Sequence, residues 1–335
     1  MRLKGEKISP RNLRLSASLC FLVEAVSQGN PRAVGQAISM VEDNGPEADA
    51  LVKALYPLRK ESLVVGITGA PGTGKSTLVD QLIERFRVAK IPVGVVAVDP
   101  SSPFSGGAIL GDRIRMMRHS ADDGVFIRSM ATRGHLGGLA KSTGDVITIL
   151  EAAGKSYILV ETVGVGQDEV DIVRHSDLVV VVLTPGAGDD IQAFKAGVME
   201  IGDLFVLNKA DLPEADRTEG QLRSMLELAG SSDSIPPIIK TVATRGEGIE
   251  ELETWIREIA KSRDSLQARS RRKQLIGWML RELVREKLYS SLLARVKPEE
   301  MELLVEKISE RQLDPYTAAD YLCRKLRTRS GKKGE

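Results

Sequence analysis

The chain has 335 residues, 42% of them hydrophobic, which is enough to bury a sizeable core in one large domain with additions or in two domains. Its 47 lysines and arginines balance 46 aspartates and glutamates, and the net charge of +1 excludes a global field that recruits nucleic acid or an acidic membrane. Aromatic residues make up only 4%, which disfavours base-stacking platforms for single strands. Any phosphate binding should therefore be local.

The two cysteines, Cys20 and Cys323, lie at opposite ends of the chain. Two isolated thiols form neither a disulfide framework nor a zinc cluster, which indicates a reducing compartment, and their apolar neighbours predict small buried side chains. No apolar run reaches the length of a membrane span. The basic N-terminus is short for a transit peptide and contains Glu6, so we expect a cytoplasmic protein that does not bind a membrane.

Residues 1–60 predict an N-terminal helical extension. Within it, Asn30 is placed as a helix N-cap, Pro31 occupies the first helical position, and Gly45 stands where the helix should stop.

Residues 61–263 alternate short apolar runs with helical stretches. Several runs are continuously apolar, which suits strands covered by helices on both faces. The rhythm predicts an α/β fold with a doubly wound, mostly parallel sheet. The predicted strands are 63–68, 93–98, 125–130, 157–162, 178–183, 204–208 and 236–242, and the predicted helices are 76–89, 138–153, 190–200, 214–229 and 248–262.

Residues 264–335 contain no strand candidate and predict a C-terminal helical extension. Residues 275–293 carry a wide apolar stripe, and Asp314 precedes a proline at the start of another predicted helix. The stripe could pack on its own domain or on a twin subunit. Because it follows an already complete α/β unit, we expect a dimerisation arm.

The stretch GAPGTGKST, residues 69–77, lies between the first predicted strand and a helix. It matches the phosphate-binding loop, whose glycines let backbone N–H groups surround an anion at the helix N-terminus. A plain turn is the alternative, which the agreement of strand, loop and helix disfavours. We expect Lys75 to reach the β- and γ-phosphates and Ser76 to bind Mg²⁺. The predicted phosphate-binding residues are Gly69, Ala70, Pro71, Gly72, Thr73, Gly74, Lys75, Ser76, Thr77 and, further along, Gly164.

Asn208-Lys209-Ala210-Asp211 ends and follows the predicted strand 204–208. An aspartate in the base plane accepts hydrogen bonds from the N1–H and the 2-amino group of guanine, whereas adenine leaves the carboxylate unpaired. Asn208 would bond to the O6/N7 side of the base or brace the loop, and the Lys209 stem would lie over the ring. In the same chain as the phosphate loop, this pattern favours GTP over ATP.

A third motif, ETVGVGQ, begins with Glu161 where many GTPases have aspartate. Its carboxylate would bind Mg²⁺ directly or through water, while the Gly164 N–H would meet the γ-phosphate, which makes the segment a candidate switch. Asp99 and Asp112 are further Mg²⁺ candidates, although Asp112 could simply cap the next helix. Gln167 is a candidate for orienting the attacking water, so Lys75, Glu161 and Gln167 form the predicted catalytic set.

The stretches GAPGTGKST, VDPSSPFSGGAILGDRIRM, ETVGVGQDE, PGAGDDIQAFKAGVMEIGD and NKAD together resemble the MeaB/ArgK-type GTPases of the SIMIBI class of P-loop proteins. The resemblance implies a homodimer that binds GTP or GDP with Mg²⁺ and hydrolyses GTP slowly until its partner stimulates it. It also implies association with an adenosylcobalamin-dependent acyl-CoA mutase, chiefly methylmalonyl-CoA mutase. The GTPase would act as a chaperone that gates cofactor loading and protects the mutase.

Carried over residue by residue, the resemblance places Ser76, Asp99, Asp112 and Glu161 around the magnesium ion and Asn208 and Asp211 at guanine. It marks residues 185–198 as an additional switch that couples nucleotide state to the mutase, with Asp189, Asp190 and Lys195 able to reorganise. The usual Ser-Ala near the last strand is Val242-Ala243-Thr244 here. The resemblance implies that backbone N–H groups of these guanine-binding residues supply most of the base contact, so guanine specificity should survive the changed side chain.

Two other functions are alternatives. A nickel-delivery metallochaperone GTPase would need a His or Cys cluster, and this chain has 3 histidines and no Cys-x-x-Cys. A kinase for a small molecule or protein, as in the older arginine/ornithine transport label, would need an acceptor pocket with a base, to which the sequence does not point.

Overall fold

The structure is a computed structural model of the whole chain. It describes residues 15–99, 117–119, 121–131, 138–162, 175–186, 202–229, 235–261 and 266–327. The chain divides into two compact units, Met1–Arg272 and Lys273–Glu335, and the division falls inside the long helix α12 (Leu266–Leu293).

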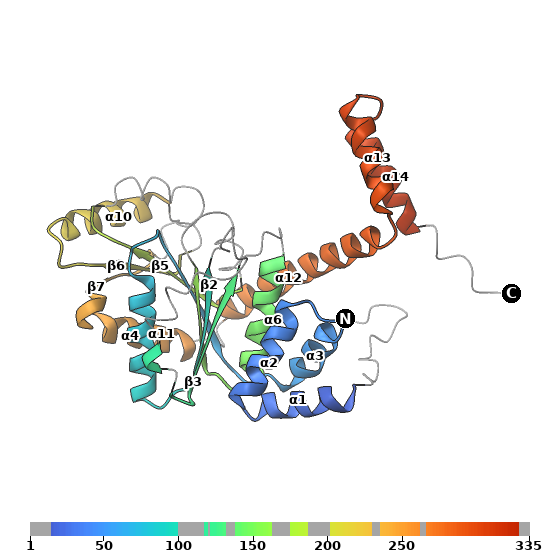
Figure 1. The fold of residues 1–335 in the computed structure, drawn as a ribbon. Coiled ribbons are helices and arrows are strands. Elements are labelled where there is room, and N and C mark those ends of the chain that lie inside the picture. Colours follow the sequence, from blue (N-terminus) through green and yellow to red (C-terminus); the bar gives the residue numbers. More distant parts are fainter. Residues whose placement is uncertain are drawn as a thin grey trace. The chain divides into compact units, whose positions relative to one another are not determined.

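The first unit is built on one parallel sheet with helices around it (Figure 1). The seven strands of this sheet have the order β3-β2-β4-β1-β5-β6-β7. Each neighbouring pair runs parallel. This confirms the predicted doubly wound α/β class and places the carboxyl ends of the strands along one edge. The strands are β1 Leu63–Thr68, β2 Val93–Asp99, β3 Val125–Ala131, β4 Tyr157–Thr162, β5 Leu178–Leu183, β6 Leu204–Asn208 and β7 Ile238–Thr241.

Helices cover both faces of this sheet, which explains why the strands are continuously apolar. In β1, Val64 belongs to a core shared with α1, α2, α3 and α6, whereas its neighbours Leu63 and Val65 belong to a core shared with α4 and α11. A third core joins α10 to β5 and β6. The helices are α1 Ala17–Ser27, α2 Pro31–Glu42, α3 Ala48–Leu55, α4 Lys75–Val88, α6 Gly138–Ala152, α10 Ala215–Ala229 and α11 Ile249–Lys261.

Local signals set the helix ends as expected. Asn30 Oδ1 accepts hydrogen bonds from the N–H groups of Arg32 at 3.0 Å and Ala33 at 3.1 Å, and α2 begins at Pro31. The helix ends at Glu42, slightly before the predicted Gly45. The predicted helix 190–200 lies outside the described residues.

The two cysteines are exposed, so the prediction of buried thiols is wrong. On α1, Leu19, Leu22 and Val26 form the buried face. Cys20 follows Leu19 directly and therefore points to another side of the helix, because successive residues are rotated by about 100°. Apolar neighbours in sequence were a poor guide because burial follows helical spacing.

The second unit contains most of α12 together with α13 (Pro298–Ser309) and α14 (Pro315–Arg327). Asp314 Oδ1 accepts from the Thr317 N–H at 2.9 Å and so caps α14, as its sequence predicts. Tyr321 donates from its hydroxyl to Glu300 Oε1 at 2.8 Å and links α14 to α13. Among the helices that the structure describes, none is long and apolar enough to cross a membrane.

Candidate functional site

The glycine-rich loop joins β1 to α4 and approaches its neighbours closely at two glycines. A Cβ on Gly69, whose φ is +150°, would lie 2.2 Å from the Val182 carbonyl oxygen in β5. A Cβ on Gly74, whose φ is +91°, would lie 2.4 Å from Asn208 Nδ2. Only glycine fits both the backbone angle and the space at these positions. The loop is thereby seated against β5 and the end of β6.

Lys75 is the first residue of α4 and is buried, with only 5% of its surface exposed. Its ammonium donates hydrogen bonds to the carbonyl oxygens of Gly69 at 2.6 Å and Ala70 at 3.0 Å. The residue before the helix is Gly74, which has no side chain to cap it. The first-turn N–H groups of α4 and the Lys75 cation therefore converge on one loop, an arrangement suited to an anion.

Ser76 and Glu161 meet next to this loop. The Ser76 hydroxyl donates to Glu161 Oε1 at 2.5 Å, and the two residues are 8% and 4% exposed. Glu161 lies in β4, where it is paired in register with Ile67 of β1. A hydroxyl and a carboxylate are hard oxygen donors of the kind that Mg²⁺ prefers. The pair fits a magnesium ion beside a phosphate-binding loop.

Asn208 is buried at the end of β6 and connects three segments. Its Nδ2 donates to the Thr73 carbonyl oxygen at 2.7 Å. Its Oδ1 accepts from the Thr241 hydroxyl at 3.0 Å and from the Ala243 N–H at 3.1 Å. Of the two roles left open by the sequence, these contacts favour the brace over direct contact with a base.

Lys209 and Asp211 lie on the exposed side of the same loop. Lys209 has a φ of +59°, and its ammonium donates to the Gly72 carbonyl oxygen at 2.9 Å. Asp211 Oδ2 accepts from Arg245 Nη2 at 3.1 Å. Because the loops after β1, β6 and β7 follow parallel strands, they meet at one edge of the sheet.

Comparison with known proteins identifies the family. The model of the methylmalonyl-CoA mutase-associated GTPase MeaB family matches residues 34–297. The chain belongs to the MeaB family. It is therefore a GTPase of the P-loop class that binds guanine nucleotides, as its loops predict.

Relatives of this MeaB-family chain match it over nearly its whole length. A GTPase of Pyrococcus abyssi is 47% identical over 312 residues, which is 91% of this chain and 96% of that protein. The mouse methylmalonic aciduria type A homolog, a mitochondrial protein, is 31% identical over 332 residues, covering 92% and 79%. The crystal structure of an LAO/AO transport system kinase superposes with a TM-score of 0.69 at 25% identity, covering 94% and 99%.

The structure brings together many of the predicted site residues of this GTPase. Residues 69–77, Glu161, Asn208, Lys209 and Asp211 lie around the ends of β1, β4 and β6. The Asp99 backbone ends β2, which pairs with β4. The Asp99 side chain lies outside the described part of the chain, as do Asp112, Gly164, Gln167, Asp189, Asp190 and Lys195.

The segment Val242-Ala243-Thr244 follows β7, with Val242 and Ala243 buried and Thr244 exposed. The Ala243 N–H donates to Asn208, so this amide supports the loop. Sequence reasoning missed Thr241 and Arg245, which hold Asn208 and Asp211. The only signal was their position, one at the end of a late strand and the other just beyond it.

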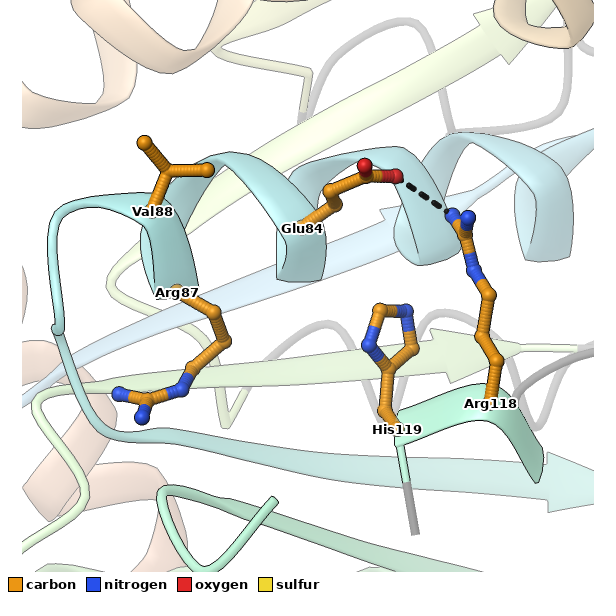
Figure 2. A pocket seen from close by; sticks show the side chains of 5 residues that line it. All are labelled: Glu84, Arg87, Val88, Arg118 and His119. Atoms are coloured by element: carbon orange, nitrogen blue, oxygen red, sulfur yellow. Dashed lines mark ion pairs between the residues drawn. The ribbon is translucent and has the colours of Figure 1, made fainter. Parts of the chain in front are cut away.

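A separate pocket of about 400 Å³ is lined by Glu84, Arg87, Val88, Arg118 and His119 (Figure 2). Arg118 pairs with Glu84 at 2.9 Å, and its guanidinium also bonds to Asp80 of α4. The hydrogen bonds from Arg87 hold the pKa of Asp122 below its usual range. Among the described residues, the cations at this pocket are thus matched by carboxylates.

Proposed function

We propose that this MeaB-family GTPase is a nucleotide-dependent chaperone of an adenosylcobalamin-dependent acyl-CoA mutase, with methylmalonyl-CoA mutase as the first candidate. It would gate loading of the cofactor and protect the mutase from inactivation. Two findings support the proposal. The family is described by its association with methylmalonyl-CoA mutase, and the mouse relative is a methylmalonic aciduria type A homolog.

The site residues receive the following roles in this proposal. The loop 69–77 and Lys75 would hold the phosphates, Ser76 and Glu161 would hold Mg²⁺, and Asp211 would read guanine. Bound there, Mg²⁺ would neutralise charge on the phosphate oxygens. Lys75 would leave the carbonyl oxygens of Gly69 and Ala70, to which it now donates, and turn to the β- and γ-phosphates.

The observation that carries the coupling is the hydrogen bond between Ser76 and Glu161. Ser76 would ligate an ion through a lone pair of its hydroxyl oxygen and Glu161 through its carboxylate, so the ion would rearrange this 2.5 Å contact. Glu161 belongs to β4, and the chain continues from that strand into the candidate switch residues Gly164 and Gln167. Nucleotide binding would therefore change a contact directly before the candidate switch residues, and a partner could sense this change.

Hydrolysis would proceed by in-line attack of water on the γ-phosphate. Lys75 and the N–H groups of the loop would stabilise the developing charge, and Gln167 is proposed to orient the water. Because this glutamine belongs to the candidate switch, we expect slow turnover by the isolated protein and faster turnover when the mutase reshapes that segment.

A homodimer is part of the proposal. Ile276, Leu280, Val284 and Leu288 recur every four residues along α12 and are 45%, 59%, 48% and 54% exposed. Such a stripe on one helix face suits burial against a second copy. Leu280→Asp should convert a dimer to a monomer in light scattering, while Arg281→Ala, its neighbour in sequence, should not. A wild-type monomer would refute this part.

The central experiment measures GTP hydrolysis and binding of GTP, GDP and ATP, with and without purified methylmalonyl-CoA mutase. We expect guanine preference, complex formation and a higher turnover when the mutase is present. Lys75→Ala serves as the variant without hydrolysis. A combined Asp189→Ala, Asp190→Ala and Lys195→Ala variant should still bind GDP but lose the response to the mutase.

Three results would contradict the proposal. A cognate mutase that neither binds nor changes turnover would remove the chaperone role. Labelled γ-phosphate recovered on an arginine or protein acceptor would favour the kinase. Tight nickel binding by the purified chain would favour the metallochaperone.

A further inference from the structure

The carboxylate of Asp211 is held by a cation that comes from a different loop. Its Oδ2 accepts a hydrogen bond from Arg245 Nη2 at 3.1 Å, although the two residues are 34 positions apart in the chain. Asp211 follows β6, and Arg245 ends the short helix η3 (Ala243–Arg245) after β7. These strands are parallel neighbours, so their carboxyl ends bring the two loops together.

The backbone that carries Arg245 is fixed by several hydrogen bonds. The Ala243 N–H donates to Asn208 Oδ1 at 3.1 Å, and the Arg245 N–H donates to the Val242 carbonyl oxygen at 2.9 Å. The Val242 N–H in turn donates to the Glu247 carbonyl oxygen at 3.0 Å. The guanidinium is therefore delivered from a defined turn that is anchored to the same asparagine as the phosphate loop.

A carboxylate that reads guanine must lie in the plane of the base and use both oxygens. The terminal torsion of an aspartate is broad, so an unsupported carboxylate samples many planes. One N–H on Oδ2 restricts this rotation and still leaves a lone pair on Oδ2 and two on Oδ1 for the base. Val242, which begins the turn that carries Arg245, has no hydrogen-bonding side chain.

We propose that Arg245 is a positioning residue for guanine recognition, which orients the Asp211 carboxylate before the base arrives. The inference rests on the proposed guanine contact of Asp211. An arginine that instead competed with the base for this carboxylate would have the opposite effect, because its removal would strengthen binding. Whether removal of Arg245 weakens or strengthens nucleotide binding therefore decides between positioning and competition.

The test compares the affinities of the full-length protein for GDP and ADP by titration calorimetry. Arg245→Met keeps the apolar stem and removes every donor. We expect it to weaken GDP binding by about two- to fivefold, the range for a partly exposed ion pair, and to leave ADP binding unchanged. Arg245→Lys should restore part of the loss. In an Asp211→Ala background, Arg245→Met should cause no further change.

Arg223→Met is a matched control. Arg223 of α10 pairs with Glu219 at 3.1 Å and is 57% exposed, against 3.1 Å and 58% for the Arg245 pair. This control should bind GDP like the wild type, and both arginine variants should melt at similar temperatures. GDP binding by Arg245→Met that equals or exceeds the wild type would overturn the inference. Unchanged preference for GDP over ADP in Asp211→Ala would instead refute the underlying guanine contact.

Discussion

Asn208 Nδ2 donates a hydrogen bond to the Thr73 carbonyl oxygen at 2.7 Å, across 135 residues of sequence. The asparagine ends the strand that leads into the proposed base-recognition loop, and the threonine lies in the phosphate loop. The contact is buried, so losing it leaves a polar atom away from water. It joins the two proposed halves of the nucleotide site by a direct contact.

Asn208→Ala should lower the free energy of unfolding by about 1–3 kcal/mol, because it leaves the groups that bond to Asn208 without their partner. Urea denaturation measures the change. Thr241→Val is the milder comparison, because Asn208 Oδ1 keeps the Ala243 N–H, and it should cost about 0.5–1.5 kcal/mol. Equal free energies of unfolding for Asn208→Ala and the wild type would show that the hydrogen bonds of Asn208 do not stabilise the fold.

Gly74→Ala should destabilise the protein and weaken nucleotide binding together. Its φ of +91° costs an alanine about 1–2 kcal/mol, and the added Cβ would displace Asn208. Gly35→Ala is the control, because Gly35 lies within α2 and a Cβ on it would meet nothing within 4 Å. That control should stabilise by about 0.5–1 kcal/mol. Thermal melts and GDP titrations of both variants test the contrast.

Ser76→Ala and Glu161→Gln should each raise the Mg²⁺ concentration needed for half-maximal GTP hydrolysis. We expect this Mg²⁺ concentration to rise at least about tenfold, which is the lower end of the loss in metal affinity seen when groups that support metal ligands are removed. Thr148→Val in α6 is a control that removes a hydrogen bond to the Gly144 carbonyl oxygen. It should change stability without changing the Mg²⁺ requirement. An unchanged requirement in Ser76→Ala would argue against the proposed ion site.

His175 should make the protein less stable in acid. Burial lowers its pKa from 6.5 to about 4, and its ring packs against Gly144 of α6. Because the unfolded state takes up the proton first, this stabilising contribution is complete above pH 6.5 and is lost as the pH falls through about 4. The loss amounts to at most about 3 kcal/mol.

Urea denaturation of the wild type and His175→Gln from pH 7.5 to about 4 isolates the contribution of His175. The difference in the free energy of unfolding between the two proteins should shrink as the pH falls. Burial raises the pKa of Glu151, whose contribution has the opposite sign and is lost as the pH rises through its folded value. Both proteins share Glu151, so it cancels. Parallel pH curves for the two proteins would contradict the prediction.

Local patterns in the sequence were enough to place the strands, the caps of α2 and α14, and the phosphate loop. Each of these depends on contacts within a few residues: a glycine that permits a turn, a side chain that caps the next N–H groups, or an apolar run covered on both faces. The strand order, by contrast, could not be predicted from local patterns. It depends on the crossover connections of the parallel sheet, which bring the ends of β1, β4, β6 and β7 to one edge.

Only that tertiary arrangement decided which polar atoms became partners. It made Asn208 a brace, paired Asp211 with Arg245 and joined Ser76 to Glu161. The phosphate loop could be predicted from the sequence because its functional groups lie within one turn of backbone. The residues that hydrogen-bond to it could not be predicted, because hydrogen bonds across more than 30 residues depend on where the sheet places each loop.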